Sequence, residues 1–312
     1  MRVFLGTAQA NIIRHRTANR RSGYHAVTKE VMRTASPETG SGRQRLRRIE
    51  GRHNPLLKEL RAAFAHSELT PAGDFAVEGF KIIEEAIRSG VRLSALFVRD
   101  SAVERAERLL PQIGSQVETI ALPDKLFDSV VPSDAPQGVA ALVRPRAWSL
   151  DDILERTQVG PVLVTAGLQD PGNLGTILRS AEAFGCAGVV LGEGTVSAFN
   201  SKVVRASAGS VFRIPWIFGK DAAPSLVALC ARLKERGVRL VATSSHKGDA
   251  LDQADLKGAL AIFIGSEGSG LPRDIASQMD GGVAIPHAPQ VESLNAGVAA
   301  SIVLYEAGRN RR

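Results

Sequence analysis

The chain has 312 residues, of which 44% are apolar and 23% charged, a composition typical of a globular protein with one or two packed cores. This composition excludes a collagen, a coiled coil and a wholly disordered chain, and no apolar run is long enough to cross a membrane. The two cysteines, Cys186 and Cys230, are too few for a disulfide framework and form no zinc-binding pair, so we expect no metal and a reducing, cytoplasmic location.

The net charge of +7 lies at the start of the chain. Residues 1–60 carry a net charge of +9, whereas residues 61–312 carry −2. A basic segment ahead of a near-neutral body is typical of proteins that bind polyanions such as nucleic acids, and a solubilising tail has the same composition. Residues 1–42 lack a hydrophobic period, so we predict a disordered basic extension there.

Residues 43–145 are predicted to form a small α/β domain, because helix and strand patterns alternate along them. The first expected helix is basic, spans residues 43–64, and is broken or begins near Pro55. The other expected helices are 80–89, 103–110 and 124–130. The expected strands are 96–99, 117–121 and 138–143.

Residues 150–312 predict a second α/β series, with a mostly parallel sheet that helices cover on both faces. The expected strands are 162–166, 189–191, 238–243, 259–264 and 282–285. The expected helices are 174–184, 201–207, 224–235 and 294–307.

The first segment that suggests chemistry is 170–181, Asp-Pro-Gly-Asn-Leu-Gly-Thr-Ile-Leu-Arg-Ser-Ala, between an expected strand and an expected helix. Pro171 and Gly172 favour a turn, and Asn173 is placed where a helix N-cap is expected. Arg179 follows six residues later, nearly two helical turns further on. An ordinary capped helix with a surface arginine explains this segment equally well.

The second segment is 264–272, Ile-Gly-Ser-Glu-Gly-Ser-Gly-Leu-Pro, at the end of a strong strand, where open α/β sheets bind ligands. Its glycines, beginning with Gly265, allow a backbone to approach a ligand closely, and Glu267 among them offers a hydrogen-bonding carboxylate. The spacing matches neither a P-loop nor G-x-G-x-x-G, which weakens the alternative of a dinucleotide enzyme. A plain glycine-rich turn is the structural alternative.

Two further segments carry polar side chains. In 285–301 a strand ends and a small-residue helix is expected to begin near Ser293, the predicted cap, with Asn295 in the first turn. In 200–209 Lys202 and Arg205 offer contacts to phosphates, and a solvated helix face explains them equally well.

The order and spacing of these segments resemble the SpoU (TrmH) family of RNA 2′-O-ribose methyltransferases of the SPOUT superfamily. Segments 173–181, 265–270 and 285–295 resemble the three signature motifs of that family, and 200–209 is similar to its intervening basic segment. Residues 50–144 look like its substrate-binding domain, including Val-Glu-Gly-Phe-Lys at 77–81.

The resemblance implies an α/β fold in which a trefoil-knotted methyltransferase domain, 150–312, follows a smaller RNA substrate-binding domain, 43–145. It also implies a homodimer and S-adenosylmethionine as the methyl donor. Three residues would line the donor pocket, mainly through backbone groups: Gly265, Ile285 and Leu294. Where the family often has Met and Gly in the third motif, this chain has His287 and Pro289.

The resemblance also implies roles for the polar side chains. Arg179 matches the catalytic arginine, and its high pKa makes it better suited to positioning the ribose hydroxyl and a phosphate than to accepting a proton. Asn173 would position Arg179 or the substrate, and Glu267 or a phosphate would relay the proton. Ser293 and Asn295 would orient the ribose.

The implied function is 2′-O-methylation of a ribose in RNA. The two-domain layout favours ribosomal RNA, and a tRNA methyltransferase or a catalytically silent RNA-binding or ribosome-assembly module are the alternatives. Phosphate contacts are expected from Lys202, Arg205, Arg43 and Arg47. Because aromatic residues are only 5% of the chain, recognition of a folded RNA by shape is expected rather than extensive base stacking.

Overall fold

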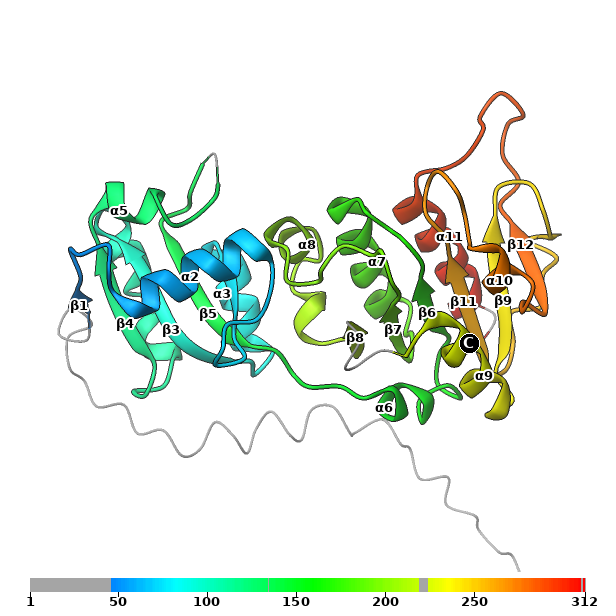
Figure 1. Cartoon of the computed structure of the whole chain (residues 1–312), viewed down its shortest axis with the longest axis horizontal. Helices are drawn as coiled ribbons and strands as arrows, with labels where there is room; N and C mark the ends of the chain where they lie inside the picture. Colours follow the sequence, from blue (N-terminus) through cyan, green and yellow to red (C-terminus); the bar gives the residue numbers. More distant parts are fainter. Residues whose placement is uncertain (1–45, 134, 219–223, 310, 312) are drawn as a thin grey trace, which may run out of the picture. The chain divides into compact units, whose positions relative to one another are not determined.

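The structure is a computed structural model, which describes residues 46–312 except 134, 219–223, 310 and 312. The expected basic extension and Arg43 therefore lie outside the described residues. The described residues belong to one compact unit that contains two β-sheets (Figure 1). None of its helices is both long enough and apolar enough to span a membrane.

The first sheet has five strands in the order β1-β4-β3-β5-β2. The β1, β4 and β3 strands run parallel, whereas β5 is antiparallel to both β3 and β2. The strands are β1 (Arg47–Arg48), β2 (Phe75–Glu78), β3 (Arg92–Arg99), β4 (Glu118–Leu122) and β5 (Val139–Arg144). The α-helices around this sheet are α2 (Pro55–His66), α3 (Phe80–Arg88), α4 (Val103–Ala106) and α5 (Asp124–Asp128).

Side chains of β3 alternate between two cores. Ala95 and Phe97 belong to a hydrophobic cluster with α2 and α5, whereas Leu96 and Val98 belong to another cluster with α3 and α4. Since successive residues of a strand face opposite sides of a sheet, helices cover both faces of the first sheet.

The second sheet has seven strands, all parallel, in the order β10-β12-β9-β11-β6-β7-β8. Its strands are β6 (Val162–Thr165), β7 (Gly188–Leu191), β8 (Trp216–Phe218), β9 (Arg239–Ser244), β10 (Asp249–Ala250), β11 (Leu260–Ile264) and β12 (Gly281–Ala284). The α-helices are α6 (Leu150–Leu154), α7 (Pro171–Ala183), α8 (Ser201–Ala206), α9 (Leu226–Glu235), α10 (Arg273–Ala276) and α11 (Ala296–Arg309).

Helices also cover both faces of the second sheet, as predicted. Val162 and Val164 of β6 lie in a cluster with α6, α9 and α10, whereas Leu163 lies in the cluster with α7, α8 and α11. The parallel α/β prediction is therefore confirmed. The short elements β8, β10, α6 and α10 were not predicted, because two to five residues carry too little hydrophobic period to be recognised.

Of the two alternatives for the helix predicted over 43–64, broken at Pro55 or beginning near it, the structure confirms the second. Arg47 and Arg48 form β1 beside β4, and the helix begins only at Pro55, with the Asn54 side chain accepting a 3.0 Å hydrogen bond from the Leu56 backbone N–H. Proline has no backbone N–H and fixes φ near the helical value, so it fits the first helical position and not a helix interior.

The two sheets share the larger hydrophobic cluster. The Phe75 ring of β2 lies 5.1 Å from the Phe199 ring, which in turn meets Trp216 of β8 at 5.4 Å between ring centroids. Ser197 Oγ also donates a 2.7 Å hydrogen bond to the Ser67 carbonyl. The two sheets are therefore joined by apolar and polar contacts between residues far apart in the sequence.

A close helix crossing supplies a test of this packing. A Cβ at Gly175 of α7 would lie 2.4 Å from the Ala206 Cβ and 2.8 Å from the Val203 carbonyl oxygen of α8. We expect Gly175→Ala to lower the free energy of unfolding by about 1–3 kcal/mol, because overpacking outweighs the better helix propensity of alanine. Urea unfolding followed by circular dichroism measures the change.

The matched control is Gly281→Ala, at a position where an added Cβ meets nothing within 4 Å. Its stability should stay within about 0.5 kcal/mol of the wild type. Equal stabilities for the two variants would contradict the close crossing of α7 and α8.

Candidate active site

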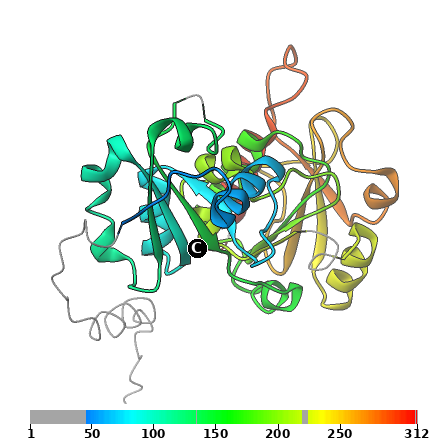
Figure 2. The ribbon, with the colours of Figure 1, turned by 60° about the vertical axis from the view of Figure 1, so that its left-hand side comes forward.

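Three of the segments singled out in the sequence follow strands of the parallel sheet. Segment 166–170 leads from β6 into α7, segment 265–272 follows β11, and segment 285–295 connects β12 to α11. Because parallel strands present their carboxyl ends at one edge, these segments lie at the edge where α/β sheets bind ligands. The last of them, coloured orange-red, extends away from the sheet in both views (Figure 1, Figure 2).

The N-terminus of α7 differs from the prediction in one detail that matters. Asp170, and not Asn173, is the N-cap, and its Oδ1 accepts a 2.7 Å hydrogen bond from the Asn173 backbone N–H. Pro171 takes the first helical position, which moves the cap one residue before the proline. The Asn173 side chain is therefore released from capping.

Asn173 uses this freedom to join the first two segments. Its Nδ2 donates a 2.7 Å hydrogen bond to Glu267 Oε1, between residues 94 positions apart in the chain. The third segment reaches the same place, because a Cβ at Gly297 of α11 would lie 3.2 Å from Asn173 Oδ1. The buried Asn173 amide is thus the point where all three segments meet.

Arg179 lies on α7, about 9 Å further along the helix axis than Asn173. Its side chain is exposed, and no hydrogen bond or ion pair to another described residue holds it. The structure does not bring Arg179 into contact with Glu267 or Asn173. All five of its N–H donors are available for an incoming phosphate or hydroxyl.

The third segment is also capped differently from the prediction. The helix α11 begins at Ala296, and Asn295 Oδ1 accepts a 3.1 Å hydrogen bond from the Val298 backbone N–H, so Asn295 is the cap and Ser293 is not. Ser293 is exposed in the loop before it, and Asn295 keeps its amide N–H₂ free of the cap. Leu294, between the two, is half-buried.

The glycine loop after β11 folds back on itself. Ser266 and Gly270 exchange two backbone hydrogen bonds of 3.2 and 3.0 Å, and Gly270 has a φ of +67°. A Cβ at Gly265 would lie 2.2 Å from the Gly270 carbonyl carbon, whereas one at Gly268 would meet nothing within 4 Å. Glycine at 265 is therefore required by the loop, and the exposed backbone at 268–270 is open to a ligand.

Hollows lie on both sides of these loops. A cavity of about 770 Å³ is lined by Glu267, the backbone of 268–270, and apolar side chains of α9 and α10. A smaller one of about 340 Å³ is lined by Ile285, His246 and His287. The His287 Nδ1 lies 2.7 Å from the Ile285 carbonyl, so Nδ1 is the protonated nitrogen, and its ring centroid is 5.6 Å from that of His246.

The basic residues of α8 face a third hollow of about 290 Å³. The Lys202 side chain is exposed, while Arg205 Nη1 lies 3.6 Å from Oε2 of Glu78, whose side chain is only 4% exposed. The Gln137 backbone N–H donates a 3.1 Å hydrogen bond to Glu78 Oε1. Sequence reasoning assigned no role to Glu78 or Gln137. The sequence held one signal for Glu78, which lies within the segment 77–81 that resembles the substrate-binding domain of the family.

The predicted RNA contact Arg47 is engaged by the protein itself. It forms an ion pair with Glu118 of the neighbouring strand, and Arg48 pairs with Asp100 at 2.7 Å. Both arginines remain more than half exposed, and exposed ion pairs contribute little to stability, so either pair can be exchanged for a phosphate contact at low cost.

Comparison with known proteins identifies the family. Residues 160–305 match the model of the SpoU rRNA Methylase family, and residues 54–141 match the MRM3-like substrate binding domain. The chain is 31% identical, over 83% of its length and 98% of the relative, to the 23S rRNA (guanosine(2553)-2'-O)-methyltransferase RlmP of Bacillus subtilis. The chain belongs to the SpoU rRNA methylase family. The resemblance seen in the sequence is thereby confirmed.

Other members of the SpoU family are similar over both sheets. An uncharacterized tRNA/rRNA methyltransferase of Mycobacterium tuberculosis is 35% identical over 88% of this chain and 89% of the relative. The crystal structure of AviRb from Streptomyces viridochromogenes in complex with the cofactor AdoMet has a TM-score of 0.72 at 29% identity, over 83% of this chain and 98% of that one. An AdoMet-bound rRNA methyltransferase from Sinorhizobium meliloti has a TM-score of 0.69 at 28% identity, over 85% and 98%.

S-adenosylmethionine is the methyl donor of this family, and the loops can be compared with what it needs. An adenosine needs an apolar wall and backbone hydrogen-bonding groups. Ile285 lines the smaller cavity and the exposed Gly268 lines the larger one, whereas Gly265 and Leu294 line neither of these two cavities. The cavities at these loops fall within the usual size range for small-molecule sites.

Because the glycine loop is closely packed at Gly265, a side chain at this position is predicted to weaken donor binding. We expect Gly265→Ala to lower the affinity for S-adenosylmethionine at least tenfold, because the added Cβ forces the loop apart at Gly270. Isothermal titration measures the affinity. In Gly268→Ala, where space is open, the affinity should stay within about twofold, and equal losses in both variants would show that the loop does not hold the donor through its backbone.

Proposed function

We propose that this chain methylates the 2′-hydroxyl of a ribose in ribosomal RNA with S-adenosylmethionine as donor. The observation that carries the proposal is the 2.7 Å hydrogen bond from Asn173 to Glu267, which joins the first two SpoU segments beside the third. It supports an assembled site, because a fold kept for RNA binding alone has no need for these side chains to meet.

The donor would be held by Gly265 at the end of β11 and by Ile285 and Leu294 at the two ends of the loop between β12 and α11. When bound, it supplies a methyl group activated by the positive sulfur. These residues act through backbone groups and apolar contact, which is consistent with their half-buried positions.

Arg179 would hold the ribose 2′-hydroxyl and the adjacent phosphate. A guanidinium stays protonated and has no acceptor site for the proton, so positioning is the role that its chemistry supports. Glu267 is an exposed carboxylate that Asn173 orients through one oxygen, which leaves its other oxygen for the hydroxyl proton. Ser293 and the free amide of Asn295 would orient the ribose from the other side.

The RNA would lie along residues 43–145 and the basic helix α8, so that 43–145 acts as the substrate-binding domain and 150–312 as the methyltransferase domain. Lys202 and Arg205 of α8 offer positive charge on the surface beside β2, and Arg47 offers it on β1, at the opposite edge of the first sheet. Arg43, which lies outside the described residues, is proposed as a further phosphate contact. Ribosomal RNA is preferred because the relative named for 23S rRNA matches over 98% of its length, both domains included.

The same proposal includes a knotted, dimeric and cytoplasmic enzyme. A knot is supported by the path of the chain from β12, next to the sheet edge, back across β9 and β11 to pack α11 on α7. A dimer is supported by one exposed apolar stripe along α11, formed by Val298, Ile302 and Tyr305 at helical spacing. The buried thiols Cys186 and Cys230 suit a reducing cytoplasm.

A methyl-transfer assay tests the reaction. Wild-type protein with methyl-labelled donor and unmodified rRNA should label one ribose, which then resists alkaline cleavage. Arg179→Ala should lower kcat by about 100-fold or more, the effect of removing one transition-state hydrogen-bond donor, with donor affinity within a few-fold.

Arg236→Ala, which removes an exposed arginine paired with Asp151, is the control and should keep full turnover. Turnover by Arg179→Ala at the wild-type rate would reject the assigned role of Arg179. Donor binding without transfer to rRNA or tRNA would favour a silent RNA-binding module.

The stripe on α11 predicts the oligomeric state. Light scattering at micromolar concentration should give twice the 33.2 kDa chain mass, and Val298→Asp should give the monomer, because a buried charge opposes association. Val227→Asp on α9, where the valine is equally exposed at 48%, should remain dimeric. A monomeric wild type would reject the dimer.

A further inference from the structure

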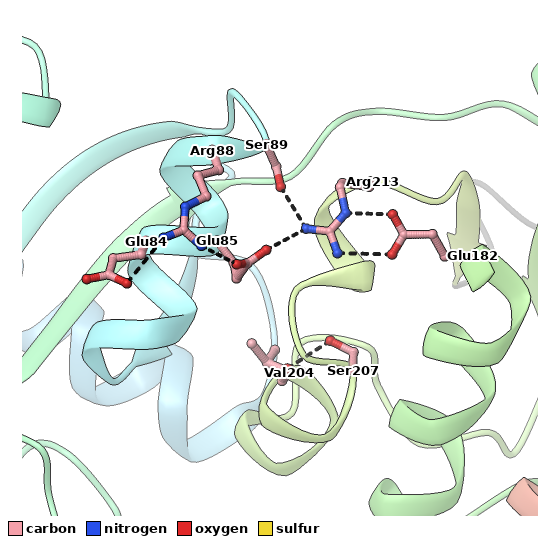
Figure 3. A network of polar contacts seen from close by, with 8 residues as sticks. All are labelled: Glu84, Glu85, Arg88, Ser89, Glu182, Val204, Ser207 and Arg213. Carbon is pink, nitrogen blue, oxygen red and sulfur yellow. Dashed lines mark hydrogen bonds and ion pairs between the residues drawn. The ribbon is translucent and has the colours of Figure 1, made fainter. Parts of the chain in front are cut away.

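One arginine contacts both the first-sheet half, residues 46–144, and the catalytic helix α7. Arg213 Nε and Nη2 donate hydrogen bonds of 2.6 and 3.0 Å to the two carboxylate oxygens of Glu182 on α7 (Figure 3). Its Nη1 donates to Glu85 Oε2 of α3 at 2.8 Å and to Ser89 Oγ at 3.2 Å. All three guanidinium nitrogens are thus engaged: Nε and Nη2 with α7, and Nη1 with the end of α3.

The backbone around Arg213 is built for this contact. Arg213 follows the turn Ser210–Phe212, which begins after Gly209 with a φ of +92°. A Cβ at Gly209 would lie 2.8 Å from the Glu85 Cβ, so α3 packs directly on this turn. Phe212, one residue before the arginine, has its ring centroid 6.2 Å from that of Phe75 of β2, with the two rings tilted by 36°. The turn is therefore held between the two sheets, and the arginine projects from it.

The charges around Arg213 alternate in sign along one line. Glu84, Arg88, Glu85, Arg213 and Glu182 each face an opposite charge (Figure 3). Burial raises the pKa of Glu182, but hydrogen bonds from Arg213 and Ser210 outweigh it, so the pKa is lowered and the carboxylate stays ionised. A bidentate, partly buried pair of this kind is stronger and more directional than an exposed ion pair.

The two anchors of Arg213 have different tasks in the proposed enzyme. Glu182 lies three residues after Arg179 on α7, whose first turn carries Asn173. Glu85 and Ser89 belong to the half that would hold the RNA. Arg213 therefore connects the RNA-holding half to the helix that presents Arg179 to the ribose.

We propose that Arg213 is a positioning residue that fixes the first-sheet half relative to α7 and so selects which ribose reaches Arg179. The inference rests on the proposed function. Neighbouring nucleotides of a stacked strand lie only a few ångström apart along the axis, so a small rotation of one half against the other presents the wrong ribose. Selection by geometry needs a rigid connection, and a three-point contact from one planar group supplies it.

The test compares Arg213→Ala and Arg213→Lys with Arg232→Ala. Arg232 is also paired, at 2.7 Å with Asp151, but both of these residues lie in the second half of the chain. Each variant is given unmodified rRNA and methyl-labelled donor, and resistance to alkaline cleavage maps every methylated ribose. Donor affinity and melting temperature are measured alongside.

For Arg213→Ala we expect at least a tenfold lower ratio of methylation at the native ribose to methylation at its neighbours, with donor affinity within twofold. Arg213→Lys should be intermediate, because an ammonium cannot hold both anchors in one plane, and Arg232→Ala should match the wild type. Glu85→Gln, which leaves α7 and its pair with Arg213 in place, should reproduce the loss of selectivity. The proposal is overturned if Arg213→Ala and Glu85→Gln both leave the ratio of native to neighbouring methylation unchanged.

A second readout does not depend on activity. Amide hydrogen exchange should rise in Arg213→Ala in the last turns of α3 and α7, and not in Arg232→Ala. Unchanged exchange in both turns overturns the proposal even if selectivity falls. Absence of transfer by the wild type rejects the proposed function instead, while increased exchange would still show that Arg213 couples the two helices.

Discussion

The hydrogen bond between the Asn173 amide and the Glu267 carboxylate joins the first turn of α7 to the glycine loop after β11, between residues 94 positions apart. The loop after β6 and the loop after β11 meet because their strands are direct neighbours in a parallel sheet. The site depends on this contact in two ways. It orients the carboxylate that is proposed to receive a proton, and it fills the space against Gly297 where α11 packs on α7.

The position of the helix cap leaves the whole Asn173 amide to the contacts of the site. Had Asn173 capped α7, its Oδ1 would accept from the helix backbone, as Oδ1 of Asn295 does in α11. Asp170, directly before Pro171, is the cap instead. The helix α7 therefore begins three residues earlier than it would with Asn173 as its cap. Asn295 shows the reverse arrangement, since it caps α11 and leaves Ser293 in the exposed loop.

The two halves of the chain are connected by more than a linker. An aromatic cluster, a serine hydrogen bond and two arginines bridge them: Arg205 reaches the buried Glu78, and Arg213 reaches Glu85. Both arginines come from the segment between β7 and β8, which follows α7 in the chain. A methyltransferase that must find one ribose in a large folded RNA benefits from such a connection. The protein then fixes the distance between the surface that holds the RNA and the site that methylates the ribose.

Sequence reasoning reached the parallel α/β fold, the family and the three segments that meet around Asn173, because hydrophobic periods and glycine, proline and asparagine spacings are local properties of the chain. It misplaced the caps of α7 and α11, because several residues in a row can serve as a cap and the packing of the helix decides among them. It had no access to Glu78 or Arg213. The partners of Arg213 lie 31 and 128 positions away, and no local pattern distinguishes it from the other arginines of the chain. Which charges meet was decided only when the two sheets packed together.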